Sequence, residues 1–271
     1  MIILRQNIFS IRKKLIDHLS DKAYEYKDRD QNLTDRLSEE ADRLGVEIYT
    51  TKGPTRYVET KGGKRRILMN KDTGNTANLA HELGHAYYKV GEGKDKIGGK
   101  IHKINYKLKK PYTKLAENLN KLDLESLSIK DQNELITKKS TKLRKSTGSA
   151  VSGLSGVLAG YKAAEEKEKG NKKKSRLISA ASLGIPVLGH VPQMGTEISA
   201  SKKGMEYLKK AGATKEQLKG SRKSMGYSLG TYGVDVGKNI LLNAGGQVAG
   251  GGIYKLTHKK KKSKEESEKK D

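Results

Sequence analysis

The chain has 271 residues, enough for one large domain or two small ones, but 34% hydrophobic residues with one Phe and no Trp leave little material for a large core. It contains no Cys, which excludes disulfides and thiolate ligands, so a metal ion can be held only by His and carboxylate side chains. The net charge of +25 indicates attraction to phosphate, in nucleic acid or at an anionic lipid surface, although lysine runs such as 172–174 and 259–262 are typical of solvated tails and linkers.

The N-terminal third of the chain is expected to form two helices, a small sheet and a further helix. Apolar residues recur at helical spacing over 4–27 and 31–44, and Gly45 is a natural helix stop. The segments VEIYTT, RYVETK and RRILMN are rich in β-branched and aromatic residues and are separated by glycine-containing turns, which predicts an antiparallel sheet of two or three strands. Capping residues then precede a helix over 77–90. The start of the chain lacks the pattern of a secretory signal peptide.

The helix predicted over 77–90 contains the motif HELGH, formed by His81, Glu82 and His85 with Leu and Gly between them. Two His residues four positions apart project from one helix face, so both rings can reach one Zn²⁺, and Glu82 is placed as the general base towards a zinc-activated water. The same pattern also arises by chance in ordinary amphipathic helices. The RRILMN strand before the helix favours the zinc site, because a zinc peptidase needs a strand edge to hold its substrate as an added strand.

A catalytic zinc site needs a third protein ligand besides the two histidines. We favour Glu197, because it opens a predicted helix, TEISASKKGMEYL, with Ala200, Ser201 and Gly204 on one smooth face that can dock on the histidine helix. We expect His18, His102 and His190 to be ordinary surface or core histidines. Glu92 follows the histidine helix too closely to turn back to it, and the alternatives for the third ligand, none of which lies in a helix suited to this role, are His102, Glu117 and His190.

The segments AHELGHA and EISASKKGMEYL resemble the neutral zinc metallopeptidases of the YugP type, relatives of the HtpX and CAAX-prenyl endopeptidase branch of the gluzincins, and LKGSRKSMGYSLGTYGVDV is similar to a further stretch of that family. The resemblance covers 67–90 and 195–236. It implies an α+β, mainly α fold with a zincin-like core, and peptide hydrolysis. The departures are a longer gap between the two islands and glycine-rich, weakly apolar segments where the family is transmembrane. The site residues that the resemblance implies are the zinc ligands His81, His85 and Glu197 and the general base Glu82.

Two further residues, Arg222 and Tyr232, lie in the matched region after the predicted ligand helix. Either could stabilise the oxyanion of a tetrahedral intermediate. The alternative is a solvated arginine and a core tyrosine.

The second half of the chain is glycine-rich and weakly apolar over 148–161, 177–196 and 239–254. Small residues at such spacing occur both in membrane helix pairs and in tightly packed soluble hairpins. We expect these segments to form a helical bundle around the zinc helix and to associate peripherally or conditionally with anionic membranes, because their Ser, Asn and Gln content makes insertion costly.

Four parts are therefore expected along the chain. They are 1–94 with the N-terminal helices, sheet and histidine helix, 95–146 as a basic helical insertion, 147–257 with the glycine-rich helices and the third zinc ligand, and 258–271 as a disordered basic tail.

The leading functional hypothesis is a zinc endopeptidase that acts on a peptide or protein. The alternative is a membrane- or virion-associated interaction protein with a vestigial zinc site, since basic, glycine-rich chains of this kind resemble minor components of phage particles. Non-specific nucleic-acid contact through the lysine runs would be accessory, because the sequence has no reading motif and no aromatic stacking platform.

Overall fold

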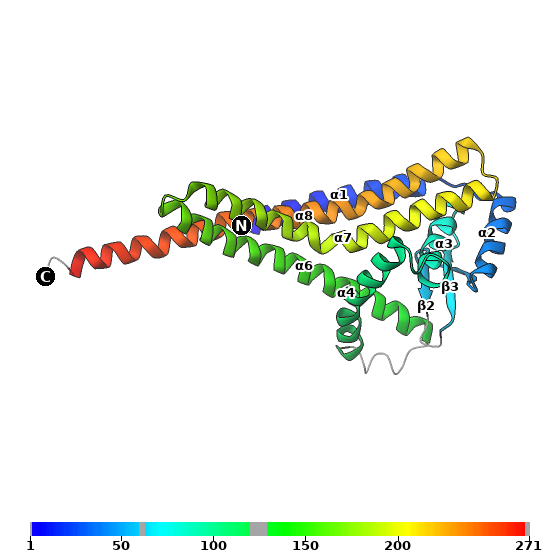
Figure 1. The fold of residues 1–271 in the computed structure, drawn as a ribbon, viewed down its shortest axis with the longest axis horizontal. Coiled ribbons are helices and arrows are strands. Elements are labelled where there is room, and N and C mark those ends of the chain that lie inside the picture. Colours follow the sequence, from blue (N-terminus) through cyan, green and yellow to red (C-terminus); the bar gives the residue numbers. More distant parts are fainter. Residues whose placement is uncertain (1, 60–62, 120–128, 269–271) are drawn as a thin grey trace. The chain divides into compact units, whose positions relative to one another are not determined.

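The computed structural model describes residues 2–59, 63–119 and 129–268, and it is mainly helical with one small sheet (Figure 1). The α+β, mainly α class predicted from the sequence is therefore confirmed. The elements are α1 (Ile2–Tyr24), α2 (Gln31–Arg43), β1 (Glu47–Thr51), β2 (Arg56–Glu59), β3 (Arg65–Asn70), α3 (Thr76–Val90), α4 (Ile97–Leu119), α6 (Ile129–Glu168), α7 (Lys172–Lys210) and α8 (Lys215–Glu268).

The chain divides into two compact units. Unit 1 comprises Met1–Thr137 and Val191–Val234, and unit 2 comprises Lys138–His190 and Asp235–Asp271. Each of the long helices α6, α7 and α8 contributes one part to each unit, so the units cut across the four consecutive parts expected from the sequence. Helix α8 continues to Glu268, into the stretch that we expected to be disordered.

The sheet of unit 1 is mixed, and the prediction of an antiparallel sheet is wrong. The strand order is β1-β3-β2, with β1 parallel to β3 and β2 antiparallel to it. The third strand inserts between the first two, which residue patterns and turns in the sequence do not reveal. The RRILMN strand, expected to offer an edge, is therefore central, and its Ile67 is fully buried. The edge strand nearer to the histidine helix is β2.

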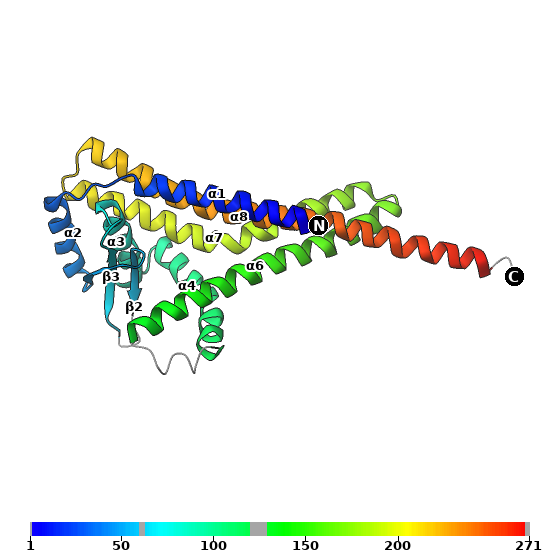
Figure 2. The same cartoon turned by 180° about the vertical axis from the view of Figure 1, so that it is seen from behind.

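The core of unit 1 lies between α3 and the sheet, with α2 beside them (Figure 1). Large aliphatic side chains fill it, and full burial of each stabilises the fold by about 1.5–3 kcal/mol. Gly45 ends α2 with a positive φ of 65°, as its position in the sequence predicts. The end of α1 lies along the start of α8, where Ser224 Oγ donates to the carbonyl of Ala23 at 2.9 Å (Figure 2). Fully buried core side chains of this unit include Leu37, Ile67, Leu79, Leu83 and Leu208.

Helix α7 starts earlier than predicted. The sequence placed a helix start at Thr196 and Glu197, but the helix is continuous from Lys172. The hydroxyl of Thr196 donates to the carbonyl of Gln193 at 2.6 Å, an interior contact, and does not cap a helix terminus. The predicted capping box at the start of α8 is confirmed, because Thr214 N donates to Gln217 Oε1 and Gln217 N donates to Thr214 Oγ1.

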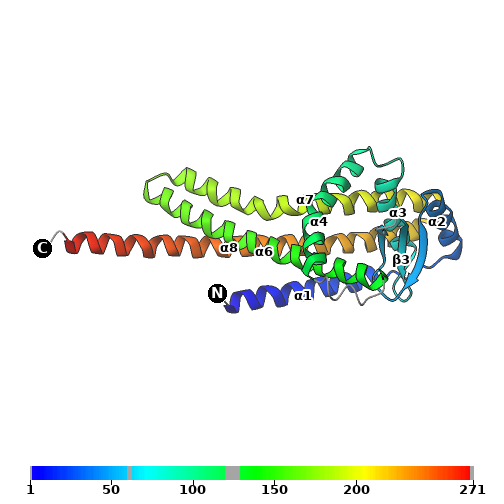
Figure 3. The ribbon, with the colours of Figure 1, turned by 90° about the horizontal axis from the view of Figure 1, so that it is seen from below.

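Unit 2 consists of helical segments from α6, α7 and α8 (Figure 3). Helices α6 and α7 form a hairpin, and Gly170 makes the turn between them with a positive φ of 83°. Within the described ranges, no single helix is both long enough and apolar enough to cross a bilayer. The two segments Lys172–Leu188 and His190–Lys210 meet both conditions only when they are taken as one span, and the chain bends between them.

Candidate metal centre

Helix α3 places His81 and His85 on one face, because residues four positions apart lie one above the other. Its N-terminus is fixed by Asn75, whose side chain accepts from the backbone N–H of Asn78 at 2.9 Å. The opposite face buries Leu79 and Leu83 in the core of unit 1. Packing of Leu79 and Leu83 therefore holds one face of the helix against the core. The two histidines lie on the other face.

Helix α7 docks on the histidine helix through small residues, as the sequence predicts. A Cβ added at Gly84 would collide with the backbone of Ala200, and one added at Gly204 would lie 2.7 Å from the carbonyl oxygen of Ala80. Ala200 itself is fully buried. This close approach of the two backbones brings Glu197 next to the histidines.

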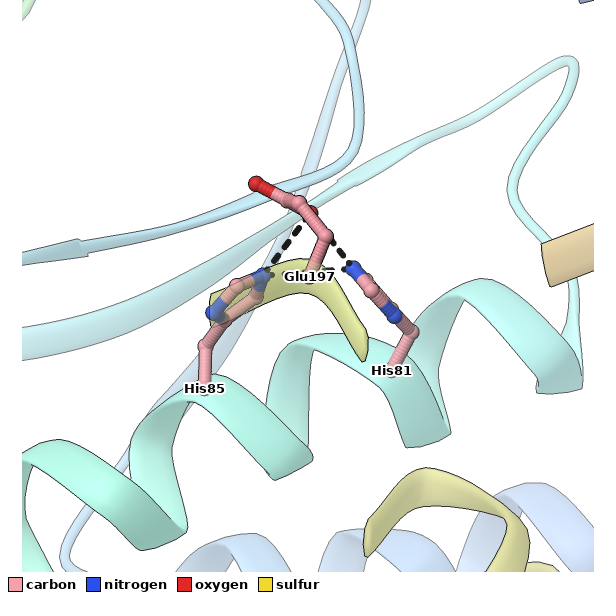
Figure 4. Close-up of side chains that lie close together, drawn as sticks. All are labelled: His81, His85 and Glu197. Carbon is pink, nitrogen blue, oxygen red and sulfur yellow. Dashed lines mark hydrogen bonds and ion pairs between the residues drawn. The ribbon is translucent and has the colours of Figure 1, made fainter. Parts of the chain in front are cut away.

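The side chains of His81, His85 and Glu197 converge on one point (Figure 4). The Nε2 atoms of the two histidines lie 3.2 Å apart, and Glu197 Oε2 lies 3.3 Å from each of them. Tetrahedral zinc with bonds of about 2.0–2.1 Å requires ligand atoms about 3.3 Å apart. The three donor atoms thus have the spacing of a tetrahedral site, and the group can hold a metal ion.

The outer nitrogens of both histidines are also bound. His81 Nδ1 lies 3.1 Å from the hydroxyl oxygen of Ser201, which is on the docking face of α7. His85 Nδ1 lies 3.0 Å from Nε2 of His102 in α4. Hydrogen bonds to the second ring nitrogen fix the orientation and tautomer of metal-binding histidines.

His102 determines which nitrogen of His85 faces the ligand group. Its Nδ1 lies 2.8 Å from the carbonyl of Gly98, which can only accept, so Nδ1 carries the proton. Burial, together with the neighbouring His85, lowers the pKa of His102 to about 4. His102 Nε2 is therefore an acceptor at neutral pH, and His85 Nδ1–H donates a hydrogen bond to it. This leaves the lone pair of His85 Nε2 directed at the point of convergence.

Sequence reasoning missed this role, since we expected His102 to be an ordinary histidine. It is 5% exposed, and its ring stacks on Tyr88 at 5.3 Å between centroids. His102 lies in the predicted insertion, and nothing in the spacing of that segment indicates that α4 returns to the histidine helix.

Glu197 and His81 shift each other's pKa values towards the charged forms. Burial alone would raise the pKa of Glu197, but the adjacent His85 and His81 hold it well below its usual value. Burial alone would lower the pKa of His81, but the hydrogen bond with Glu197 and the nearby charge of Glu82 raise it overall. Glu197 is therefore an anion at neutral pH, ready to neutralise positive charge at this point.

Glu82 lies beside the ligand group and outside it. Its Oε2 accepts a hydrogen bond of 2.6 Å from the backbone N–H of Tyr57 in the edge strand β2. This N–H points away from β3, so the outer edge of β2 faces the histidine helix and Glu82 occupies its Tyr57 donor. The strand edge expected beside the site is present, but β2 provides it and β3 does not.

A pocket of about 260 Å³ opens next to these side chains. The residues that line it include His81, Glu82, Glu197 and Tyr232, together with polar and apolar residues of the surrounding elements. Burial and the charge of Glu197 raise the pKa of Tyr232, so its phenol remains protonated and can donate a hydrogen bond. Arg222, the other expected oxyanion candidate, is exposed and does not line the pocket.

The alternative ligands do not join this group. Among the described residues, the metal-binding geometry is met by His81, His85 and Glu197. Glu92 is exposed and lies 3.8 Å from Arg43, and His190 belongs to unit 2, where Asn239 Nδ2 lies 2.9 Å from its Nε2. Glu117, on α4, is not part of the group either.

Comparisons with protein-family models, with curated proteins and with solved structures found no match.

Proposed function

We propose that the chain is a zinc-dependent endopeptidase in which His81, His85 and Glu197 hold the metal and Glu82 is the general base. The observation that carries this proposal is the tetrahedral spacing of 3.2–3.3 Å among the three donor atoms. Two imidazoles and one carboxylate form a ligand set of catalytic zinc, which leaves a fourth position open for water. An open pocket lined by His81, Glu82 and Glu197 supports a catalytic site over a closed structural one.

Zinc bound at this site would supply a Lewis acid that acidifies a coordinated water and polarises the scissile carbonyl. The protein's own contribution begins with Glu82, which faces the same pocket without being one of the ligands. It would take a proton from the attacking water and deliver it to the leaving nitrogen. The Tyr57 N–H holds this carboxylate in place before substrate arrives.

Tyr232 and β2 would position the substrate around this chemistry. The protonated phenol of Tyr232 is a hydrogen-bond donor for the negative charge that develops on the carbonyl oxygen. An extended peptide added to the outer edge of β2 would run past the ligand group, which suits cleavage within a chain. The resemblance of 67–90 and 195–236 to the YugP-type peptidases agrees with this proposal.

The substitution Glu82→Gln tests the assignment. We expect it to lower kcat/KM on labelled casein by about 10²–10⁴-fold, because the amide cannot accept the proton, while the zinc content stays unchanged. The matched control is Glu92→Gln, because Glu92 lies just beyond the same helix and is exposed. Loss of zinc in the Glu82 variant, or activity equal to that of the control, would contradict the proposed role.

A further inference from the structure

Unit 2 has a largely polar interior and carries large apolar side chains on its exterior. Among its described residues, the buried hydrophobic side chains are Ala159, Ala163 and Tyr254, whereas the buried polar ones include Ser152, Ser182, Asn239 and Asn243. The large apolar side chains point outward from all three helices. We call six of them, which are between 65% and 79% exposed, the outer belt: Leu154, Leu158, Leu177, Leu188, Val248 and Leu256.

Asn243 is the centre of the interior and is fully buried. Its Nδ2 donates to the Ser152 carbonyl at 3.0 Å and to Ser155 Oγ at 2.9 Å. Its Oδ1 accepts from Ser182 Oγ at 2.9 Å and from Gln247 Nε2 at 3.0 Å. The amide is satisfied entirely within the protein, without any need for water.

The backbones of helices α6 and α8 are in direct contact at glycine residues. A Cβ added at Gly156 or Gly160 would collide with the backbone of α8, and one added at Gly246 or Gly250 would collide with the backbone of α6. Each pair of glycines is spaced by four residues, the arrangement in which small residues allow helices to pack within lipid.

Buried polar side chains combined with exposed large apolar ones are unusual for a protein surrounded by water. Soluble proteins bury large apolar side chains and expose polar ones, and contiguous apolar surfaces mark interaction sites. In hydrocarbon the preference is reversed, because polar groups must be satisfied internally and apolar groups lose nothing by exposure. Glycine, serine and asparagine lower the mean hydropathy of each helix, but several of them, such as Ser152, Ser182 and Asn243, are buried between the helices.

Charged residues lie at both ends of the uncharged stretch of α8, and the belt residue Leu256 lies just beyond it, next to Lys255. Residues 239–254 of α8 contain no Asp, Glu, Lys or Arg, and at 1.5 Å per residue they span about 24 Å. The Lys145–Asp235 ion pair of 3.0 Å lies at one end of this stretch. At the other end Lys162 and Lys169 flank Glu165. The hydrocarbon core of a bilayer is about 30 Å thick, and lysine stems at the ends of a short segment can reach its interface.

We propose that the outer belt of unit 2 contacts the acyl chains of an anionic lipid bilayer, with the charged residues at its two ends in the headgroup layers. The outward apolar positions belong to all three helices, which suits a surrounding solvent better than one protein partner. The net charge of +25 favours anionic headgroups. This inference goes beyond the peripheral association expected from the sequence, and it does not depend on the proposed zinc chemistry.

Single nitroxide labels test the contact, because the chain has no Cys and each introduced one is unique. Labels at Leu154→Cys and Val248→Cys should gain collisions with oxygen and lose them with a water-soluble nickel chelate when vesicles of phosphatidylcholine and phosphatidylglycerol are added. A label at the exposed Lys167→Cys should stay accessible to the chelate. Belt labels that remain accessible to the chelate with vesicles would overturn the proposal. So would belt labels shielded from both reagents without lipid while the mass doubles, which would identify a second copy as the partner.

Flotation measures the strength of the same contact. The full chain should float with these vesicles and stay bound in about 1 M salt, where the Debye length is about 3 Å, and through an alkaline wash. Leu154→Gln with Leu158→Gln should lower the partition coefficient by about tenfold per leucine. Leu154→Ile with Leu158→Ile keeps the apolar surface and should bind as the unsubstituted chain does. Release by salt, or equal binding of both double variants, would show surface adsorption only and refute the proposal.

Discussion

The two units bury opposite kinds of side chain. Unit 1 encloses large aliphatic residues such as Leu79 and Leu83 between a helix and a sheet, whereas unit 2 encloses Asn243 and serines and exposes its leucines. Unit 1 is therefore stabilised by removal of apolar surface from water. Unit 2 is held by internal hydrogen bonds and by glycine-mediated backbone contact between its helices.

Buried polar groups also have different structural roles in the two units. In unit 1 the buried His102 and Ser201 bind the outer nitrogens of the candidate metal ligands, so their hydrogen bonds orient a site. In unit 2 the hydrogen bonds of Asn243 join three helices. Substitutions of the same kind in the two units should consequently give different results.

The largest difference is expected for leucine truncation. Leu83→Ala should destabilise unit 1 by about 2–5 kcal/mol, because Leu83 is fully buried and the cavity cannot close completely. Leu158→Ala in unit 2 should change stability in water by no more than about 0.5 kcal/mol, because Leu158 is 72% exposed. Urea unfolding of both variants measures the contrast. Equal losses would mean that the outer belt is a core in solution.

The next effect concerns the hydrogen bond to His85. His102→Ala should weaken zinc binding by about 10–100-fold, because His85 loses the acceptor that fixes its tautomer. His102→Gln should recover part of the affinity, since its side-chain oxygen can accept from His85 Nδ1. Competition with a fluorescent zinc chelator gives the dissociation constants. Unchanged affinity in the Ala variant would show that His102 is not needed to orient His85.

An effect of comparable size is expected from the polar interior of unit 2. Asn243→Ala should cost about 1–3 kcal/mol, because Ser182, Gln247 and the Ser152 carbonyl lose their partner in a buried place. Hydrogen exchange resolved to peptides should show faster exchange over 239–254 and no change in α3. The control Asn118→Ala, at an exposed position of α4, should leave exchange unaltered. Slower exchange in the Asn243 variant would contradict the structural role of this network.

Local patterns predicted the candidate site well because its main parts are short-range. The spacing of His81 and His85, the cap at Asn75 and the small face around Ala200 are each contained within one helix turn or two. Complementary small faces were sufficient to bring Glu197 to the histidines, even though its helix starts much earlier than predicted.

The features that the sequence did not predict depend on long-range pairing. The insertion of β3 between β1 and β2 fixes which strand is the edge, and a strand's residue pattern is the same in either place. The return of α4 to α3 brings His102 to His85 across a segment without any recognisable motif. The inward orientation of serine and asparagine in unit 2 likewise emerges only when three helices are seen together.

The position of bound zinc tests the central claim most directly. Crystals of the zinc-loaded chain, measured on both sides of the zinc absorption edge, should show one anomalous peak about 2.0–2.2 Å from Nε2 of His81, Nε2 of His85 and a carboxylate oxygen of Glu197. Glu82 should lie close by without coordinating the metal. A zinc ion held by His102 or Glu82 in place of Glu197, or no zinc at this group under saturating conditions, would contradict the account.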